Sequence, residues 1–244
     1  MMRRTLLCAA FVAACALRVA AQAADDYPRV EVYGGYSHAR VESNGGANTF
    51  AFGGGPATTV EPCAAGSAAV FGANFQRFFC ERRGFHGFDA SVTYNVSRRV
   101  GLKADVTGHY KSETFFDAPE TNDTRERLHQ FLFGVQLKEN SRGARVKPFA
   151  HALAGVARYS DRNHESAPDF DAVIRDELTS FALKLGGGLD VRAGRHLDVR
   201  VFELDYNPVF AGRRDLEVTG LPLTIALGGR TAHNFTVGAG LVFH

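Results

Sequence analysis

The feature that most constrains the fold is an alternation of apolar and polar residues with a period of two, which recurs along the chain. In residues 85–96, every second residue from Phe88 to Val96 is apolar or aromatic, and polar residues or glycine lie between them. Because side chains alternate between the two faces of a strand, this pattern predicts a strand with one apolar face. Residues 100–110 and 234–243 repeat it clearly. Five further segments follow it with less contrast: 29–40, 128–139, 146–160, 179–193 and 197–209.

Two of these segments are ambiguous. Small residues blur the two faces of 146–160, so its orientation stays open. In 197–209, Asp198 and Arg200 share one parity while Glu203 and Asp205 share the other. We hypothesise a one-residue bulge near Val201–Phe202, which would bring all four charged side chains to one face.

The connections between the predicted strands alternate between short and long. The short ones follow strands two, four and six, and the long ones follow the odd-numbered strands up to the seventh. The short connections are 97–99, 140–145 and 194–196, and the long ones are 41–84, 113–127, 161–178 and 210–231. The sequence therefore predicts an all-β fold, an eight-stranded antiparallel up-and-down transmembrane β-barrel with short periplasmic turns and long extracellular loops.

A barrel of this size is either soluble, with an apolar interior, or embedded in a membrane, with an apolar exterior. The apolar rows approach the 9–11 residues that a tilted strand needs to cross hydrocarbon. Aromatic residues near the strand ends suit interfacial girdles, and these are Tyr36, Tyr94, Tyr110, Tyr159, Tyr206 and Phe243. Both features favour the membrane, and a soluble periplasmic lipocalin-like barrel that binds an apolar ligand is the alternative.

The rows opposite the apolar ones carry charges of both signs. A Lys or Arg that faced lipid near the midplane would cost about 2–4 kcal/mol, so in a membrane these rows must face the lumen and pair there. The predicted lumenal charge network comprises Asp89, Lys103, Asp105, Lys184, Asp190, Arg192, Asp198, Arg200, Glu203 and Asp205. A lumen filled by such side chains leaves little room for a continuous channel.

The N-terminal segment indicates export. Arg3 and Arg4 precede an apolar stretch, and Ala21-Gln22-Ala23 forms a small-x-small cleavage site, so we expect residues 1–23 to be a signal peptide and 24–244 the barrel. A cut before Cys15, leaving a lipidated cysteine, is the alternative. A formal net charge of +2 for the whole chain provides no basic field for nucleic acid.

Outside the predicted signal the sequence holds Cys63 and Cys80, both in the connection 41–84. In an oxidising compartment such a pair forms a disulfide, and two separate thiols are the alternative. The same connection is rich in phenylalanine, so it is the candidate contact element for a partner. Its aromatic residues, which either bind that partner or pack on one another, are Phe50, Phe52, Phe71, Phe75, Phe78 and Phe79.

Several residues suggest chemistry but have simpler explanations. Ser37 and His38 resemble the start of a nucleophile–base pair, and His109 and His151 accompany the predicted lumenal aspartates. An ion-pair network explains the second group, and the glycine runs 53–55 and 186–188 lack the Lys-Ser/Thr ending of a phosphate loop. We therefore predict no catalytic site, metal or cofactor.

The chain resembles the small outer-membrane β-barrel proteins of the OmpA/OmpX type, the outer membrane protein β-barrel domain family. The segments that carry the resemblance are 32–37 (VYGGYS), 87–92 (GFDASV), 102–110 (LKADVTGHY), 148–153 (PFAHAL), 186–191 (GGGLDV) and 205–206 (DY). The resemblance implies a monomeric barrel among the lipids of the bacterial outer membrane. It implies a non-enzymatic role in structural support or in adhesion-type surface interaction through the loops. A lipid-modifying enzyme is the alternative, and the sequence names no partner.

Overall fold

The computed structural model describes residues 27–42, 48–52, 58–60, 63, 73–117, 119–141, 143–219 and 223–244. The predicted signal peptide 1–23, with its alternative cut before Cys15, lies outside these residues. No helix among them has the length and hydropathy of a membrane span.

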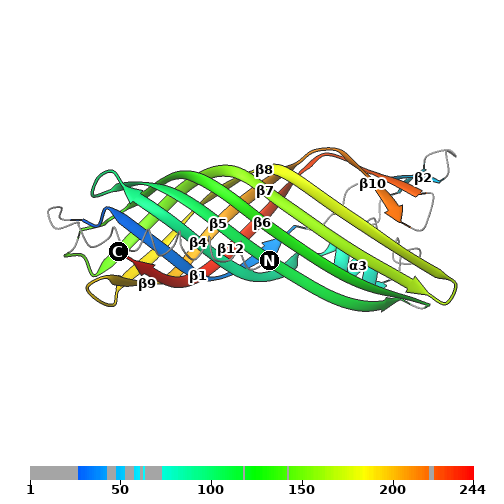
Figure 1. Cartoon of the computed structure of the whole chain (residues 1–244), viewed down its shortest axis with the longest axis horizontal. Helices are drawn as coiled ribbons and strands as arrows, with labels where there is room; N and C mark the ends of the chain where they lie inside the picture. Colours follow the sequence, from blue (N-terminus) through cyan, green and yellow to red (C-terminus); the bar gives the residue numbers. More distant parts are fainter. Residues whose placement is uncertain are drawn as a thin grey trace, which may run out of the picture.

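Eight long strands form a closed barrel (Figure 1). They are β1 (Val30–Val41), β4 (Arg83–Asn95), β5 (Val100–Asp117), β6 (Glu120–Lys138), β7 (Val146–Ala167), β8 (Phe170–Arg192), β9 (Leu197–Ala211) and β12 (Arg230–Phe243). Each pairs antiparallel with its neighbours, and β12 closes the barrel by pairing with both β9 and β1. The predicted eight-stranded antiparallel barrel is confirmed.

The alternation places apolar side chains outside and polar side chains inside. On β5, Val106 is 37% exposed, whereas its neighbour Asp105 is 1% exposed. On β6, the buried side chains of Gln130 and Gln136 face inward. The exposed apolar row of the same strand comprises Phe131, Phe133, Val135 and Leu137. An apolar outer wall around a polar interior is the arrangement that a lipid environment stabilises.

The hypothesised bulge on β9 is present. Asp190 pairs with Arg200 and Leu189 pairs with Phe202, so Val201 has no partner on β8. Val201 and Phe202 both face outward, at 52% and 41% exposure. The extra residue reverses the parity of the strand, and all four of its charged side chains are consequently buried in the lumen.

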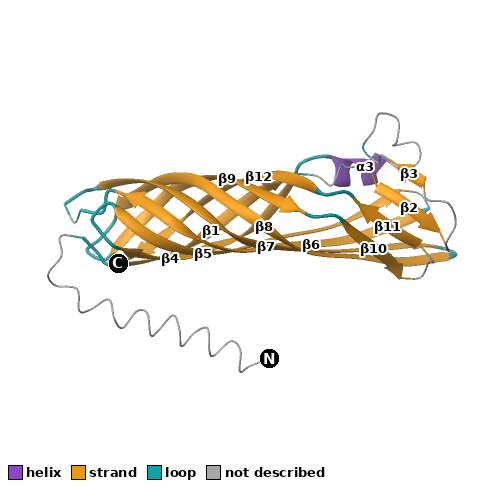
Figure 2. Cartoon of the chain, turned by 90° about the horizontal axis from the view of Figure 1, so that it is seen from above, coloured by secondary structure: helices purple, strands orange, loops and turns teal. Residues whose placement is uncertain are grey.

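Two connections that we predicted as loops are strands instead. Residues 113–127 belong to the hairpin β5–β6, which stays in register to the pair Asp117↔Glu120, and 161–178 belong to β7–β8, which stays in register to Ala167↔Phe170. Both hairpins project past the barrel (Figure 2). The prediction failed because both faces of these segments are largely polar, so the pairing leaves no period-two pattern of hydrophobicity.

The other two long connections extend the same wall. They contribute β2 (Asn48–Phe52), β3 (Thr58–Val60), β10 (Arg214–Thr219) and β11 (Leu223–Leu227), which add to β8 in the order β10, β11, β2, β3. On the far side, the helix α3 (Ala73–Cys80) contacts β5, where the Asn74 Nδ2 donates to the Phe116 carbonyl at 2.9 Å. We call this projecting part of the molecule the rim, and the opposite end the turn end.

The predicted disulfide is formed. Cys63 and Cys80 are joined with a Cα–Cα distance of 5.4 Å. The bond joins Cys80, the last residue of α3, to Cys63, which lies three residues after β3, so one covalent link connects the helix beside β5 to the edge strand of the rim.

Candidate functional site

The centre of the lumen is a set of buried ion pairs. The Lys184 ammonium lies 2.7 Å from Asp105 Oδ1 and 3.0 Å from Asp89 Oδ2, and the Lys103 ammonium lies 3.2 Å from Asp105 Oδ2. These side chains are almost completely buried. Each buried charge therefore has a partner of opposite sign, which is the condition for its burial to be tolerated.

Arg200 is the best-held cation of the network. Its Nε and Nη2 donate to the two carboxylate oxygens of Asp190 at 2.8 and 3.2 Å, and its Nη1 donates to Glu203 at 2.7 Å. The rings of Tyr33 and Phe149 each lie 4.0 Å from the guanidinium carbon. Bidentate pairing combined with cation–π contacts fixes this side chain across the lumen.

The network extends towards the turn end through residues that we did not predict. Lys138 lies 2.9 Å from Glu31 and 2.8 Å from Asp190, and Lys147 lies 2.7 Å from Asp198. Glu31, Lys138 and Lys147 were missed because they lie near strand ends, where few alternating residues remain. Each lies two residues from a side chain that faces the lumen, and this spacing would have identified them. Of the ten predicted network residues, Arg192 alone is partly exposed.

His151 is the centre of the one metal-like group among the described residues. A ligand atom of His151, Glu203 and Asp205 each lies within 4.8 Å of the others. The His151 Nε2 is 2.9 Å from Asp205 Oδ1, but the Lys103 ammonium is 3.3 Å from both His151 Nδ1 and Glu203. A divalent cation would have to displace this ammonium, so the donor set fits an ion pair better than a metal.

Ser37 and His38 do not form a nucleophile–base pair, because the two side chains face opposite ways. Ser37 is buried in the lumen, whereas His38 lies on the outer parity beside His86. Ser37 instead contacts His109 Nε2 at 2.9 Å, and His109 Nδ1 has no hydrogen-bond partner. A serine–histidine pair without an orienting acid, sealed inside the lumen, lacks the geometry of a nucleophilic triad.

Above the ion pairs the lumen becomes apolar. A cluster of buried apolar side chains crosses it: Ala39, Val41, Phe85, Leu128, Leu132, Leu153, Ala157, Ala182, Val209 and Ala232. An interior filled by ion pairs alone was therefore an incomplete prediction. Tyr159 packs against this cluster, so its assignment to the outer aromatic girdle is corrected.

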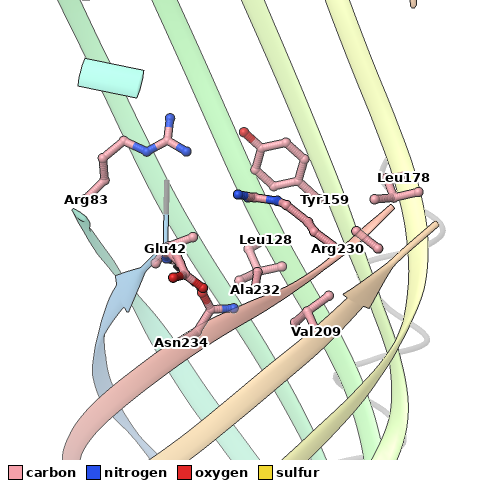
Figure 3. Close-up of a pocket in the computed structure, with 11 residues that line it drawn as sticks. Glu42, Arg83, Leu128, Tyr159, Leu178, Val209, Arg230, Ala232 and Asn234 are labelled. Atoms are coloured by element: carbon pink, nitrogen blue, oxygen red, sulfur yellow. Dashed lines mark hydrogen bonds between the residues drawn. The ribbon is translucent and has the colours of Figure 1, made fainter. Parts of the chain in front are cut away.

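A small pocket of about 50 Å³ lies between the apolar cluster and the rim. In Figure 3, Leu128, Ala232 and Val209 lie below Arg83, Arg230 and Tyr159. The volume suits a few water molecules and is far below the roughly 300–1,000 Å³ of small-molecule sites.

The inner face of the rim carries three carboxyl groups in one row. Glu126, Asp161 and Asp176 lie directly opposite one another on β6, β7 and β8, and all three are buried. Arg83 contacts Glu126 at 2.6 Å, and the Tyr159 hydroxyl donates to the same carboxylate. Burial, with the nearby Glu126 charge, raises the pKa of Asp161 to about 8.

Tyrosine–histidine pairs line the outer wall where the apolar rows end. The hydroxyl oxygens of Tyr36, Tyr110 and Tyr206 lie 2.5, 3.0 and 2.6 Å from nitrogens of His86, His129 and His233, respectively. These tyrosines were predicted as girdle residues, but their histidine partners were not. The pairs place polar ring atoms at the boundary of the apolar band, as interfacial residues do.

The predicted contact residues of 41–84 are only partly located. Phe75, Phe78 and Phe79 belong to α3, and Phe50 and Phe52 belong to β2. Phe71 lies outside the described residues. The role of these rings as a contact surface stays a prediction.

The sequence matches the family model of the outer membrane protein β-barrel domain over residues 7–243. No curated protein matches it. Among solved structures, it is similar to Neisserial surface protein A, with 10% identity, a TM-score of 0.39, and 90% of this chain and 99% of that one covered.

Two further solved structures are similar, with comparable sequence identities and TM-scores. The first is Ail, the attachment invasion locus protein of Yersinia pestis, in complex with the heparin analogue sucrose octasulfate, at 12% identity and a TM-score of 0.39, with 88% and 99% covered. The second is the outer membrane protease OmpT from Escherichia coli, at 10% identity and a TM-score of 0.44, with 88% and 96% covered.

Proposed function

Because the chain belongs to the outer membrane protein β-barrel domain family, we propose that it is a non-enzymatic barrel that presents a folded β-sheet rim to molecules outside the cell. The protein is located in the bacterial outer membrane, so the soluble lipocalin-like alternative is set aside. The rim faces outwards in this proposal, and the turn end faces the periplasm.

The lumen supports a structural role for the barrel. The ion pairs around Lys184 and the apolar cluster around Leu128 and Leu153 fill successive levels of the interior. The pocket above them is too small for a ligand of ordinary size. A filled interior makes a rigid wall, and such a wall can hold a projecting surface in a fixed geometry.

The rim is the observation that carries the proposal. The hairpins β5–β6 and β7–β8 continue for eight or more residues past the end of the apolar rows with an unbroken register. Strands from two other connections extend the sheet at Val218↔Ile174, a disulfide joins α3 to Cys63, and Asn74 of α3 hydrogen-bonds to β5. An ordered sheet of this extent is unnecessary for spanning a membrane, and it offers a preorganised surface to a partner.

The test shortens one hairpin of the rim and keeps the barrel. Asp161 and Asp176 lie directly opposite each other, so residues 162–175 can be replaced by Asn-Gly, which forms a two-residue hairpin turn. Bacteria that display this variant should lose attachment to host cells or matrix proteins that the parent binds. The variant should still show a heat-dependent gel shift, because the barrel is intact.

A matched variant localises the contact. Lys111 and Glu126 are also directly opposite each other, so 112–125 can be replaced in the same way to shorten β5–β6 alone. Loss of attachment in either variant supports a rim contact and identifies the hairpin. Full attachment by both variants, with both barrels folded, would refute the proposal.

A lipid-modifying enzyme is the second candidate, and the tyrosine–histidine pairs are the observation that favours it, because they lie where lipid ester bonds meet the interface. We expect the lipid A and phospholipid profiles to stay unchanged when His86, His129 and His233 are replaced by Gln. The same is expected for single substitutions of His38, His109 and His151. A changed profile in any folded variant would restore the enzyme hypothesis.

A further inference from the structure

Three arginines form a row on the outer wall of the rim. Arg125 on β6 lies directly opposite Arg162 on β7, which lies directly opposite Arg175 on β8. The three strands lie side by side and run past the barrel (Figure 1). Arg127 and Arg158 lie on the same strands closer to the barrel. We call these five residues the arginine patch.

The arginine patch faces away from the lumen. All five side chains are exposed, whereas their neighbours in the chain Thr124, Glu126, Asp161 and Asp176 are buried. The alternation therefore puts the acids Glu126, Asp161 and Asp176 on the inner face of these three strands, and the outer face carries the five arginines together with Asp123 and Glu177. The arginine patch therefore lies on the same outer face of these strands as the lipid-facing apolar rows, but beyond the end of those rows.

The charges of the arginine patch are only partly balanced within the chain. Arg125 lies 3.4 Å from Asp123 and Arg158 lies 3.0 Å from Glu177. Arg127, Arg162 and Arg175 form no ion pair with any described residue. Like charges directly opposite each other on a sheet destabilise it, so an external anion would relieve the repulsion.

The height of the arginine patch identifies the environment of that anion. The last fully apolar row on these strands is Phe131↔Val156↔Phe181, whose members are exposed. Arg158 lies two residues beyond this row, and the Arg125–Arg162–Arg175 row lies six residues beyond it. With roughly 3.4 Å per residue and a tilt of about 45°, these offsets correspond to about 5 and 14 Å along the membrane normal. The patch thus spans the headgroup layer and the space just above it.

The arginine patch is confined to one sector of the barrel. Outside this sector, the exposed arginines near the rim occur singly: Arg40 on β1 lies opposite Phe235 on β12, and Arg82 lies over the Phe235 ring and pairs with Glu42. A general attraction to an anionic surface would not require the basic residues of three adjacent strands to be in register, whereas recognition of a molecule with several anionic groups would.

We propose that the arginine patch binds the phosphate groups of a phosphorylated glycolipid in the outer leaflet. Each guanidinium presents a planar fork of N–H donors that fits two phosphate oxygens. The exposed rings of Phe131 and Phe181 lie below it, where they contact the acyl chains of the same lipid. One lipid is then held by an apolar contact and by a row of charge-assisted hydrogen bonds, and this binding is independent of the proposed attachment function.

The test compares two double variants with the same loss of charge. Arg162→Gln with Arg175→Gln removes two members of the arginine patch, and Arg99→Gln with Arg195→Gln removes two exposed arginines at the turn end. Purified full-length barrels in neutral detergent are titrated with lipopolysaccharide, with the same material after dephosphorylation, and with inorganic phosphate. We expect the patch variant to bind lipopolysaccharide about thirtyfold more weakly, since each arginine near an anionic lipid contributes roughly a factor of five.

The control variant should bind lipopolysaccharide as the parent does. The dephosphorylated lipid should bind all three proteins equally weakly, and inorganic phosphate alone should not bind, because it lacks the acyl anchor. Unchanged lipopolysaccharide affinity in the patch variant would overturn the proposal. So would tight binding of inorganic phosphate, which would indicate a site for a soluble anion.

Two more outcomes are decisive. If the patch variant loses binding to heparin but keeps binding to lipopolysaccharide, the partner is a sulfated polysaccharide and the lipid proposal is wrong. If the patch variant fails to fold, as judged by the absence of a heat-dependent gel shift, the proposal is tested by lipid binding to the parent protein alone. Its preference for the phosphorylated over the dephosphorylated lipid, suppressed by high salt, supports the proposal, and equal affinity refutes it.

Discussion

The lumen and the rim are both rich in charge, but they arrange it differently. In the lumen, each of the cations Lys103, Lys138, Lys147, Lys184 and Arg200 lies within 4.0 Å of at least one carboxylate. In the rim, like charges share a row: three carboxyl groups lie opposite one another on the inner face, and three arginines lie opposite one another on the outer face. Ion pairs fill space and add rigidity, whereas a row of like charges favours binding of a counter-ion or uptake of a proton.

The difference follows from the surroundings of each region. A charge in the lumen has no access to water or ligand, so it must be neutralised by a neighbour in the chain. The rim lies beyond the apolar rows, where water and external ions can compensate a charge. We therefore expect substitutions in the lumen to affect folding and those in the rim to affect local stability or binding.

The largest effect is expected for Lys184→Met. This change leaves Asp89 and Asp105 without their closest cation, and breaking a buried pair in this way costs about 3–5 kcal/mol. Urea unfolding of the barrel in lipid vesicles measures the loss. The matched control is Arg192→Met, which removes a partly exposed cation and should cost roughly 0.5 kcal/mol. Similar losses for the two variants would contradict a balanced lumen.

A smaller and local effect is expected for Cys63→Ser. The disulfide connects the two sides of the rim, and closing a loop of this size is worth about 3 kcal/mol to the segment that it orders. Protease should therefore cut within 41–84 faster in the variant, and reductant should have the same effect on the parent. Urea unfolding of the barrel should not change. Unaltered protease sensitivity would show that the link does not order the rim.

The smallest effect is expected for the ionisation of Asp161. Its pKa is raised to about 8, so between about pH 4 and pH 8 the folded rim holds a proton that the unfolded chain releases. Stability of the rim then falls as the pH rises through this window. Asp161→Asn should remove the dependence and stabilise the rim by about 1 kcal/mol at pH 8, since nearby water limits the gain.

Hydrogen exchange of the β7 and β8 amides, expressed as protection factors at pH 6 and pH 8, measures this change. The Lys184→Met barrel should keep the same pH dependence in the rim, because Lys184 lies in the lumen. A rim whose protection is independent of pH in the parent would contradict a buried, protonated Asp161.

Much of the barrel could be predicted from the sequence, because each strand of a lipid-facing wall must alternate apolar and polar residues without interruption. Val92, Val106 and Val237 lie on the outer face, as their positions in this alternation predict. Asp105 and Lys184 lie on the inner face. Even the bulge at Val201 could be predicted, because four charged residues of one strand fall on alternate faces unless one extra residue is inserted between them. The rim could not be predicted in this way, since segments such as 113–127 are polar on both faces.

The candidate sites were predicted unevenly for a related reason. The acids and bases of the network were found from their parity, but the pairing of Ser37 with His109, or of Arg200 with Tyr33 and Phe149, joins residues on different strands. The arginine patch is likewise invisible in sequence, because Arg125, Arg162 and Arg175 are scattered along 51 positions.

The sequence by itself determined the strand number, the strand direction and the side that faces lipid, because hydrocarbon imposes one alternating pattern on every strand that crosses it. Only the tertiary structure decided which charges meet across the lumen, where the interior turns apolar, and how the polar connections build a rim. Those outcomes depend on the register between strands, and register is a property of pairs of strands that no single segment encodes.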